Sequence, residues 1–90
     1  MDRAGSDWGP ILEEWPRGMD RKGILLTTFQ ETITFIDFRV SNGVLLLDRD
    51  RPDSHGARKV LLSMGSIAAL KFADPGDLSS YEQMGFLGDR

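Results

Sequence analysis

The single histidine of the chain, His55, is the first residue that could support chemistry. It lies in the turn-rich segment Pro52–Gly56, with Asp50 and Asp53 close by in the sequence. One imidazole and two carboxylates can bind a divalent metal, but no second histidine and no cysteine supports such a site. We therefore expect His55 to be a solvated loop side chain, and we expect no metal and no cofactor.

A pair of carboxylates is the second candidate. Asp37 and Asp48 face each other if the strands on either side of Asn42-Gly43 pair, and paired carboxylates can raise one pKa for acid–base catalysis. Arg39 is a close neighbour in that register, which favours a neutralised surface network instead. One histidine allows no credible Ser–His–Asp arrangement, and no glycine-rich phosphate loop is present. The residues therefore predict no enzyme and no small-molecule substrate.

The longest polar stretch, residues 48–59, contains four basic side chains on both sides of its turn-forming residues. These are the candidate phosphate contacts: Arg49, Arg51, Arg58 and Lys59. Interleaved aspartates oppose binding to a polyanion, and no aromatic residue lies among the basic ones to stack a base. The net charge of −3 also argues against a strongly basic nucleic-acid binder. Mixed charges of this kind are usually a solvated surface.

The length of 90 residues predicts one small domain. Its apolar fraction of 40% and charged fraction of 28% are typical of a globular chain. The absence of cysteine excludes disulfides and fits a reducing compartment. No apolar run is long enough for a signal peptide or a membrane span, so we expect a cytoplasmic protein with no membrane partner.

The stretch that must position these residues is Thr32–Asp48, TITFIDFRVSNGVLLLD. Two apolar and β-branched runs flank Asn42-Gly43, a dipeptide that favours the type I′ turn of a β-hairpin. The resulting register places one set of side chains on a core face: Ile36, Phe38, Val40, Leu45 and Leu47. Val44 and Leu46 then share the opposite face with charged residues, so that face needs a partial cover, either a terminal segment of the chain or a second subunit.

The alternation of apolar residues changes phase before this turn. Ile33 and Phe35 keep one parity, whereas Ile36 and Phe38 keep the other. Adjacent residues cannot both point inward in a regular strand, so a β-bulge or a bend is expected near Phe35 and Ile36. A long, bent second strand is what a small closed barrel requires.

Three further strands are predicted, at Ile24–Phe29, Val60–Met64 and Ile67–Phe72, with Gly65 as a pivot between the last two. The elements describe a mainly β fold, a small five-stranded bent sheet or barrel over residues 23–73. Residues 1–22 are expected to form a tail and a short helix. Residues 74–90 are expected to form a second short helix and tail.

The two short helices have local signals. Pro10 suits the first turn of a helix within Trp8–Trp15. Near the C-terminus, Asp77 or Ser79 can cap a short helix. Glu82 lies three residues after Ser79, as in a capping box, and Gly85 is expected to end the helix.

The segment VLLSMGSIAAL, Val60–Leu70, resembles the second motif of Sm-like proteins, in which an apolar strand breaks at a short glycine-containing turn and resumes at an isoleucine. The strand order, the leading helix and Gly23 before the first strand also look like that family, over residues 8–72. The resemblance implies a small β-barrel that forms rings. Ser63-Met64 or Met64-Gly65 replaces the family's arginine–glycine pair, and no glycine lies inside the bent strand. The RNA contacts of the family are therefore not carried over.

Apolar surface in excess of one small core indicates a protein partner. The candidate partner-binding residues are Trp8, Trp15, Val44, Leu46, Tyr81 and Phe86. We expect a non-catalytic small-barrel interaction module, either a homo-oligomer or a small subunit of a larger assembly. For the segment Trp8–Trp15, packing of its apolar face over the open end of the domain's own core is the favoured interpretation, and docking to another chain is the alternative. The alternative function is an Sm-like RNA-binding ring.

Overall fold

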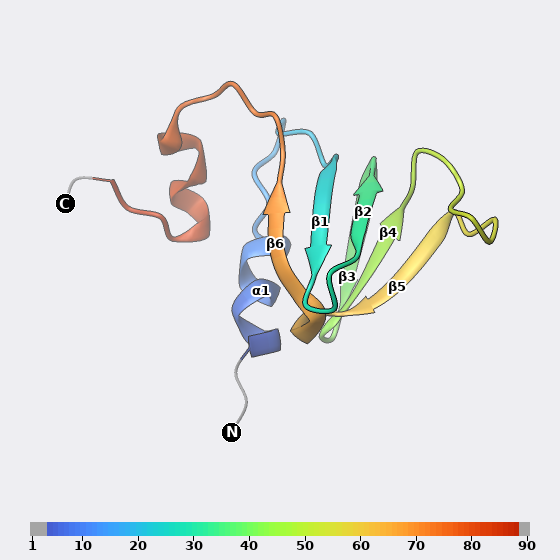
Figure 1. The fold of residues 1–90 in the computed structure, drawn as a ribbon. Helices are drawn as coiled ribbons and strands as arrows, with labels where there is room; N and C mark the ends of the chain where they lie inside the picture. The colour runs from blue at the N-terminus through green and yellow to red at the C-terminus, as the bar shows by residue number, and fades with distance from the viewer. Residues whose placement is uncertain (1–3, 89–90) are drawn as a thin grey trace.

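The computed structural model describes residues 4–88, which form a mainly β fold (Figure 1). The elements are α1 (Ala4–Glu13), β1 (Gly23–Thr27), β2 (Thr32–Phe35), β3 (Asp37–Ser41), β4 (Val44–Asp48), β5 (Lys59–Ser63), the 3₁₀ helix η1 (Met64–Ser66), β6 (Ile67–Lys71) and the 3₁₀ helix η2 (Leu78–Met84). The strands form two three-stranded antiparallel sheets, ordered β2-β1-β6 and β3-β4-β5. The mainly β class is confirmed, but the count of five strands is wrong.

The sixth strand arises because the long second strand bends at Ile36 and is divided into β2 and β3. Phe35 and Phe38 are both buried, at 4% and 2% exposed, whereas Ile36 between them is 48% exposed. The N–H of Ile36 donates to the carbonyl of Asp48 over 2.8 Å, which holds the bend against β4. The expected bend is confirmed. The placement of Ile36 on the core face is wrong, because the bend turns Phe35 inward in its place.

The hairpin of β3 and β4 has the expected register, with Asp37 opposite Asp48 and Ser41 opposite Val44. Asn42 and Gly43 have φ angles of 46° and 83°, the positive values that a type I′ turn requires. Both predictions are confirmed. The inward face of the hairpin carries three buried side chains and one half-buried: Phe38, Leu45, Leu47 and Val40.

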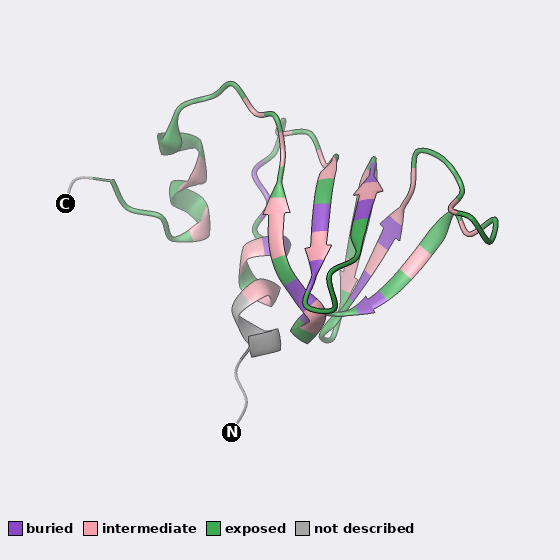
Figure 2. Ribbon diagram, viewed as in Figure 1, coloured by how far each residue is buried: buried purple, intermediate pink, exposed green. Residues whose placement is uncertain are grey.

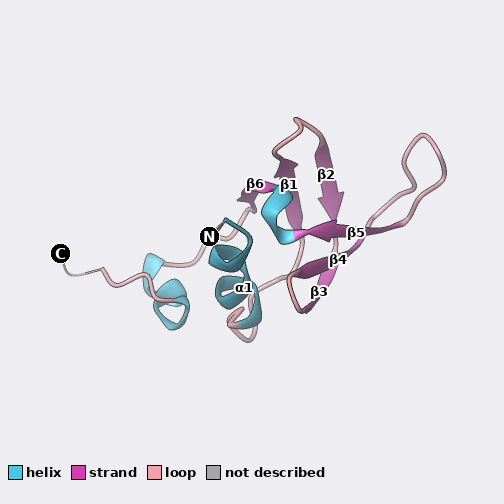
Figure 3. Cartoon of the chain, turned by 90° about the horizontal axis from the view of Figure 1, so that it is seen from below, coloured by secondary structure: helices cyan, strands magenta, loops and turns pink. Residues whose placement is uncertain are grey.

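The pivot between β5 and β6 is the 3₁₀ helix η1. The Ser63 hydroxyl accepts a hydrogen bond of 3.3 Å from the N–H of Gly65, and Met64 is buried below the turn. This turn directs β6 to β1 in the other sheet (Figure 3). Over residues 4–88, β5 and β6 each remain a sheet edge and the strands do not close into a barrel. Closure is therefore the part of the fold prediction that is wrong.

The first strand is shorter than expected because a tight turn follows Thr27. The Thr27 hydroxyl accepts a hydrogen bond of 2.9 Å from the N–H of Glu31, and Gln30 has a φ of 69°. Phe29 therefore leaves the strand and is 60% exposed.

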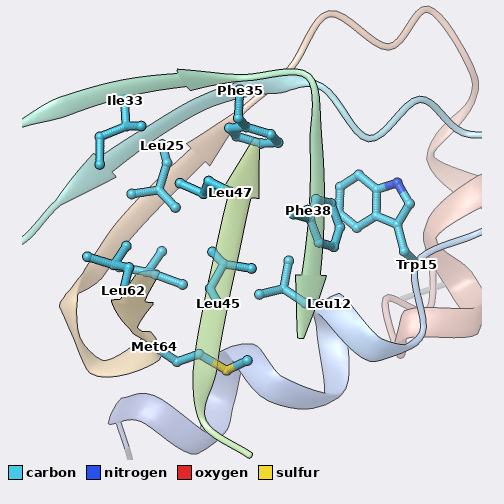
Figure 4. Close-up of a cluster of buried hydrophobic side chains, with 11 residues drawn as sticks. Leu12, Trp15, Leu25, Ile33, Phe35, Phe38, Leu45, Leu47, Leu62 and Met64 are labelled. Atoms are coloured by element: carbon cyan, nitrogen blue, oxygen red, sulfur yellow. The ribbon is translucent and has the colours of Figure 1, made fainter. Parts of the chain in front are cut away.

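Helix α1 closes one end of the core between the two sheets (Figure 4). Leu12 is fully buried there, and the Trp15 ring meets the rings of Phe38 and Phe72 edge-on, with centroids 5.3 and 5.2 Å apart. Because the helix begins at Ala4, Pro10 lies inside it, and the prediction that Pro10 occupies the first turn is wrong.

The C-terminal arm, residues 77–88, lies beside α1 and away from the strands (Figure 1). Gly85 ends η2 with a φ of 102°, as expected, and its N–H reaches the carbonyls of the last turn. The cap position is Asp77, one of the two expected start positions, but its side chain makes no capping hydrogen bond. The capping box of Ser79 with Glu82 is therefore wrong.

Candidate partner-binding surface

The sheet β3-β4-β5 has an outer face opposite the core, hereafter the outer face. Its central row runs from Arg39 through Leu46 to Leu61, because these residues are cross-strand partners. The adjacent row places Val44 beside Ser63. Val44, Leu46 and Leu61 therefore form one apolar patch across strands β4 and β5.

This patch is not covered by the rest of the described chain. Leu61 is 72% exposed and Val44 41% exposed, and Leu46 between them is half-buried (Figure 2). Helix α1 and the C-terminal arm lie on the β6 side of the molecule, and β5 lies on the other side (Figures 1 and 3). Neither terminal segment therefore provides the cover that the two-sided hairpin was expected to need.

Ion pairs border the patch at the end of the hairpin distant from its turn. Arg39 lies 2.9 Å from Asp37, and Lys59 lies 3.1 Å from Asp48. All four side chains are substantially exposed, so each pair contributes little to stability and both signs of charge remain available at the rim.

The outer face continues into a free sheet edge. Backbone hydrogen bonds bracket the β4–β5 ladder at its two ends, from Met64 N to Gly43 O over 2.9 Å and from Arg49 N to Arg58 O over 2.8 Å. Hydrogen-bonded and non-hydrogen-bonded pairs alternate along an antiparallel ladder. The N–H and C=O groups of Lys59, Leu61 and Ser63 therefore point away from β4, along an edge that no other described strand pairs with. Such an edge is a template for strand addition.

The expected partner residues occupy different environments in the structure. Val44 and Phe86 are exposed, at 41% and 53%. Trp8 is half-buried against the core, and Tyr81 is half-buried against Phe72. Trp15 is 7% exposed and belongs to the core. Packing of this segment against the domain's own core is therefore confirmed for Trp15. Trp15 is therefore not accessible to a partner in the folded protomer.

Leu61 was not among the expected partner residues, although it is the most exposed apolar side chain of any strand described. The signal was present in Val60–Ser63, since Leu62 faces the core and its neighbour Leu61 must then face outward. Leu78 of the C-terminal arm was also missed as surplus apolar surface, and it is 83% exposed. Leu87 was counted in that surplus, and it is 67% exposed.

The basic loop residues are mostly engaged with their own chain. Arg51 lies 3.5 Å from Asp50, and Lys59 pairs with Asp48. The guanidinium of Arg49 donates to the Thr34 hydroxyl over 3.4 Å, and its Nε is buried without a hydrogen-bond partner. The loop therefore presents a set of locally neutralised charges along with Arg58.

His55 lies at the exposed tip of a loop that Asp53 organises. One carboxylate oxygen of Asp53 accepts from the N–H groups of His55 and Ala57, over 2.8 and 2.9 Å. The bonds from Ala57 and then His55 lower the pKa of Asp53. In the part of the chain that the structure describes, no group of three or more His, Cys, Asp or Glu side chains could hold a metal ion.

Asp37 and Asp48 do face each other, but each has its own cation. Partial loss of water raises the pKa of Asp37, and bonds from the Phe38 N–H and the Arg39 side chain outweigh that effect, so its pKa is lowered overall. A lowered pKa keeps this carboxyl ionised near neutral pH and unsuited to act as an acid. The geometry favours the neutralised surface network.

A cavity of about 870 Å³ lies between the segment before β1, the start of β1, the end of β2 and the end of β6. Ile24, Ile36 and Phe72 contribute its apolar wall, and charges of both signs, including Lys71 and Asp74, line its rim. The lining mixes apolar side chains with charges of both signs, so the cavity indicates no particular ligand chemistry.

The chain matches no protein-family model, no curated protein and no solved structure. Among the helices of residues 4–88, none has the length and apolar character needed to cross a lipid bilayer.

Proposed function

We propose that the chain is a non-catalytic interaction module that self-associates through the outer face. The observation that carries this proposal is the patch of Val44, Leu46 and Leu61, which faces water on a sheet whose other side already forms the core. Association that removes this patch from water is favoured by the hydrophobic effect.

The free edge of β5 gives the association a second source of stabilisation. An added strand satisfies the outward backbone groups of Lys59, Leu61 and Ser63 while it covers the side chain of Leu61. The rim carries both signs of charge, so it does not select a strongly acidic or basic partner. A second copy of the chain fits these conditions.

An Sm-like architecture is the finer description of the fold that we propose. It is supported by the leading helix α1, the bent strand formed by β2 and β3, and the short turn η1 between two apolar strands. In that description the edge strands β5 and β6 are where the sheet of one protomer ends and that of another can continue.

Replacement of Leu46 by glutamate tests self-association. Analytical ultracentrifugation at micromolar concentration should give the parent chain a mass that is a multiple of 10.1 kDa. The variant Leu46→Glu should sediment closer to the mass of one chain, with its circular dichroism spectrum retained. Phe29→Glu is the matched control, because Phe29 is 60% exposed on the turn after β1 and outside the outer face.

A parent chain that sediments as a single 10.1 kDa species would overturn the proposal. Equal loss of assembly in the Leu46→Glu and Phe29→Glu variants would show that the outer face is not the specific contact.

The second candidate function is that of an Sm-like RNA-binding ring. It is favoured by the position of η1 between β5 and β6, where the Sm-like motif is expected to lie. Protein purified at low salt should then show an absorbance ratio at 260 and 280 nm that reveals bound RNA. A steep decrease in RNA affinity with added salt would support this candidate, because phosphate contacts release counterions.

A further inference from the structure

The edge strand β5 has no feature that keeps a second strand from pairing with it. Sheet edges are commonly protected by proline, by a bulge or by a charge that points into the sheet. The sequence of β5 is KVLLS, and its ladder with β4 runs from Asp48–Lys59 to Val44–Ser63 without a shift of register. The charged side chain of β5, Lys59, is already paired with Asp48 over 3.1 Å. The strand is therefore open to the addition of another strand along its whole length.

The other edge strand, β6, is less suited to such an addition. Its ladder with β1 has a register shift next to Thr27, which pairs with Ile67 while the preceding pair of the ladder uses Ala69, so Ala68 is left over as a bulge. Helix α1 and the C-terminal arm also lie on this side of the molecule (Figures 1 and 3). A second copy therefore reaches β5, but not β6, without meeting a terminal segment.

The outward backbone groups of β5 are centred on Leu61. The N–H and C=O groups of Lys59, Leu61 and Ser63 point away from β4, and no backbone hydrogen bond of the described residues outside the sheets uses them. An antiparallel strand pairs such groups residue against residue. If the added strand is a second β5 with Leu61 opposite Leu61, then Lys59 faces Ser63 on both sides of the centre. Every outward group then has a partner, and a two-fold axis passes between the two Leu61 residues.

Other alignments of the same two strands are less favourable. A shift of the register towards Lys59 places Ser63 opposite the loop residue Ala57, beyond the end of β5. Parallel pairing in register would stack each Lys59 on its own copy, and like charges directly opposite destabilise a sheet. The antiparallel register centred on Leu61 avoids both effects, because each lysine faces a neutral serine.

The same register joins the apolar patches of the two copies. Leu61 is 72% exposed in one protomer, and its cross-strand partner on the other side is Leu46. In the pair of copies each Leu61 lies between Leu46 of its own sheet and Leu61 of the other, which covers its exposed flank. The cations of this face, Arg39 and Lys59, are each paired with a carboxylate of their own copy. The copies therefore meet without uncompensated like charge, which a contact between identical surfaces requires.

We propose that two copies of the chain pair their β5 strands antiparallel about a two-fold axis at Leu61, so that the two β3-β4-β5 sheets become one continuous sheet. This inference rests on the proposed self-association and names the strand, the direction and the register of the contact. A contact in which both copies use the same surface closes on itself, so it gives a dimer and not a ring or an open chain.

Proline at position 63 tests the hydrogen bonds between copies without changing the ladder inside the protomer. Ser63 has a φ of −64°, the value that proline imposes, and its N–H points away from β4. Ser63→Pro therefore removes the donor to Lys59 of the second copy and leaves the bonds between β4 and β5 intact. Ser63→Ala is the matched control, because it also loses the hydroxyl that accepts from Gly65 but keeps the N–H.

Analytical ultracentrifugation should give the Ser63→Ala variant the mass of a dimer, twice 10.1 kDa. The dimer affinity of Ser63→Pro should be lower by about tenfold or more, since both copies lose a hydrogen bond. A circular dichroism spectrum like that of the alanine variant shows that the proline variant is folded.

Introduced cysteines test the register, and the chain has none of its own. Lys59→Cys and Ser63→Cys place thiols opposite each other only when the two variants pair. Hydrogen-bonded antiparallel residues have Cα atoms about 5.5 Å apart, a separation that a disulfide spans. Mild oxidation of an equimolar mixture should give a disulfide-linked dimer of the two variants, and each variant alone should stay unlinked. Phe29→Cys mixed with Ser63→Cys is the control and should not link, because Phe29 lies on the turn after β1.

The outcomes separate this inference from the proposed function. If the parent is an oligomer while Ser63→Pro assembles like Ser63→Ala and the cysteine mixture does not link, the pairing of β5 strands is overturned and the outer face remains the contact. Disulfides within each cysteine variant alone, with none between the two variants, would indicate parallel strands and overturn the two-fold contact. A parent chain that is a monomer overturns the proposed function and this inference with it.

Discussion

The hydroxyl of Tyr81 donates a hydrogen bond of 2.6 Å to the carboxylate of Asp74, while its ring stacks on Phe72 at the end of β6. One side chain thus attaches the C-terminal arm to the body in two ways. Asp74 lies in the link before the arm, so the bond also fixes the direction in which the arm leaves β6. The orientation of Leu78 and Leu87 depends on this contact.

Removal of the hydroxyl should loosen the arm without releasing it. Tyr81→Phe keeps the ring on Phe72 and loses a hydrogen bond worth about 1 kcal/mol. Amide hydrogen exchange should then become faster in residues 78–84 and stay unchanged in β4. Tyr81→Leu removes both contacts and should accelerate exchange further. Unchanged exchange in the phenylalanine variant would show that the bond does not hold the arm.

The same bond predicts a response to alkaline pH. The hydrogen bond to Asp74, followed by loss of water contact, raises the pKa of Tyr81 from 10.0 to about 12. A folded pKa above the unfolded one means that the stabilisation is complete below pH 10 and is lost as the pH rises towards about 12.

The chain has a single tyrosine, so phenolate absorbance reports this titration directly. The midpoint should lie near 12 in the native protein and return towards 10.0 in the variant Asp74→Asn. A native midpoint at 10.0 would contradict the contact.

The turn of the central hairpin should be sensitive to β-branched side chains. Gly43 has a φ of 83°, a conformation that valine resists, so Gly43→Val should lower the free energy of unfolding by more than ~1 kcal/mol. Gly43→Asn is the control, because asparagine tolerates the left-handed region, and it should cost less. An unchanged midpoint of urea unfolding for the valine variant would contradict the assignment of a type I′ turn.

Gly23 should tolerate no side chain for a different reason. A Cβ at this position would lie 2.5 Å from the carbonyl oxygen of Lys71 on the neighbouring strand. Gly23→Ala must push β1 and β6 apart and should cost about 1–3 kcal/mol. The variant Gly65→Ala places its Cβ in ordinary contact, 3.7 Å from Ser63 Oγ, and should unfold like the parent. Equal stability of the two variants would contradict the close approach.

The loop after β4 should be replaceable. Most of Pro52–Gly56 is exposed, and its organising bonds are internal to the loop, centred on Asp53. Exchange of these residues for a short Gly/Ser linker should leave the melting temperature nearly unchanged, because a change in loop length alters the closure entropy only slightly. Loss of the folded state would show that the loop is packed and that His55 has a structural role.

Local sequence preferences were enough to predict the hairpin and which residues pair across its two strands. Asn42-Gly43 specifies a turn with two positive φ angles, and a two-residue turn leaves one register for the strands it joins. The opposition of Asp37 and Asp48, the break at Ile36 and the pivot at Gly65 follow from alternation and from residue types within a few positions. Such features depend on backbone preferences that the neighbouring residues determine.

Which face of each other strand is buried could be determined only from the tertiary structure. Phe35 and Ile36 are equally suited to a core by type, and only the pairing of β2 with β1 turned Phe35 inward and Ile36 to the surface. Trp15 and Leu61 show the same limit, since one is buried by rings from distant strands and the other is exposed because β5 ends its sheet. Sequence alone determined which residues alternate, whereas contacts between distant segments decided which side of each alternation faces water, because burial depends on what packs against a strand.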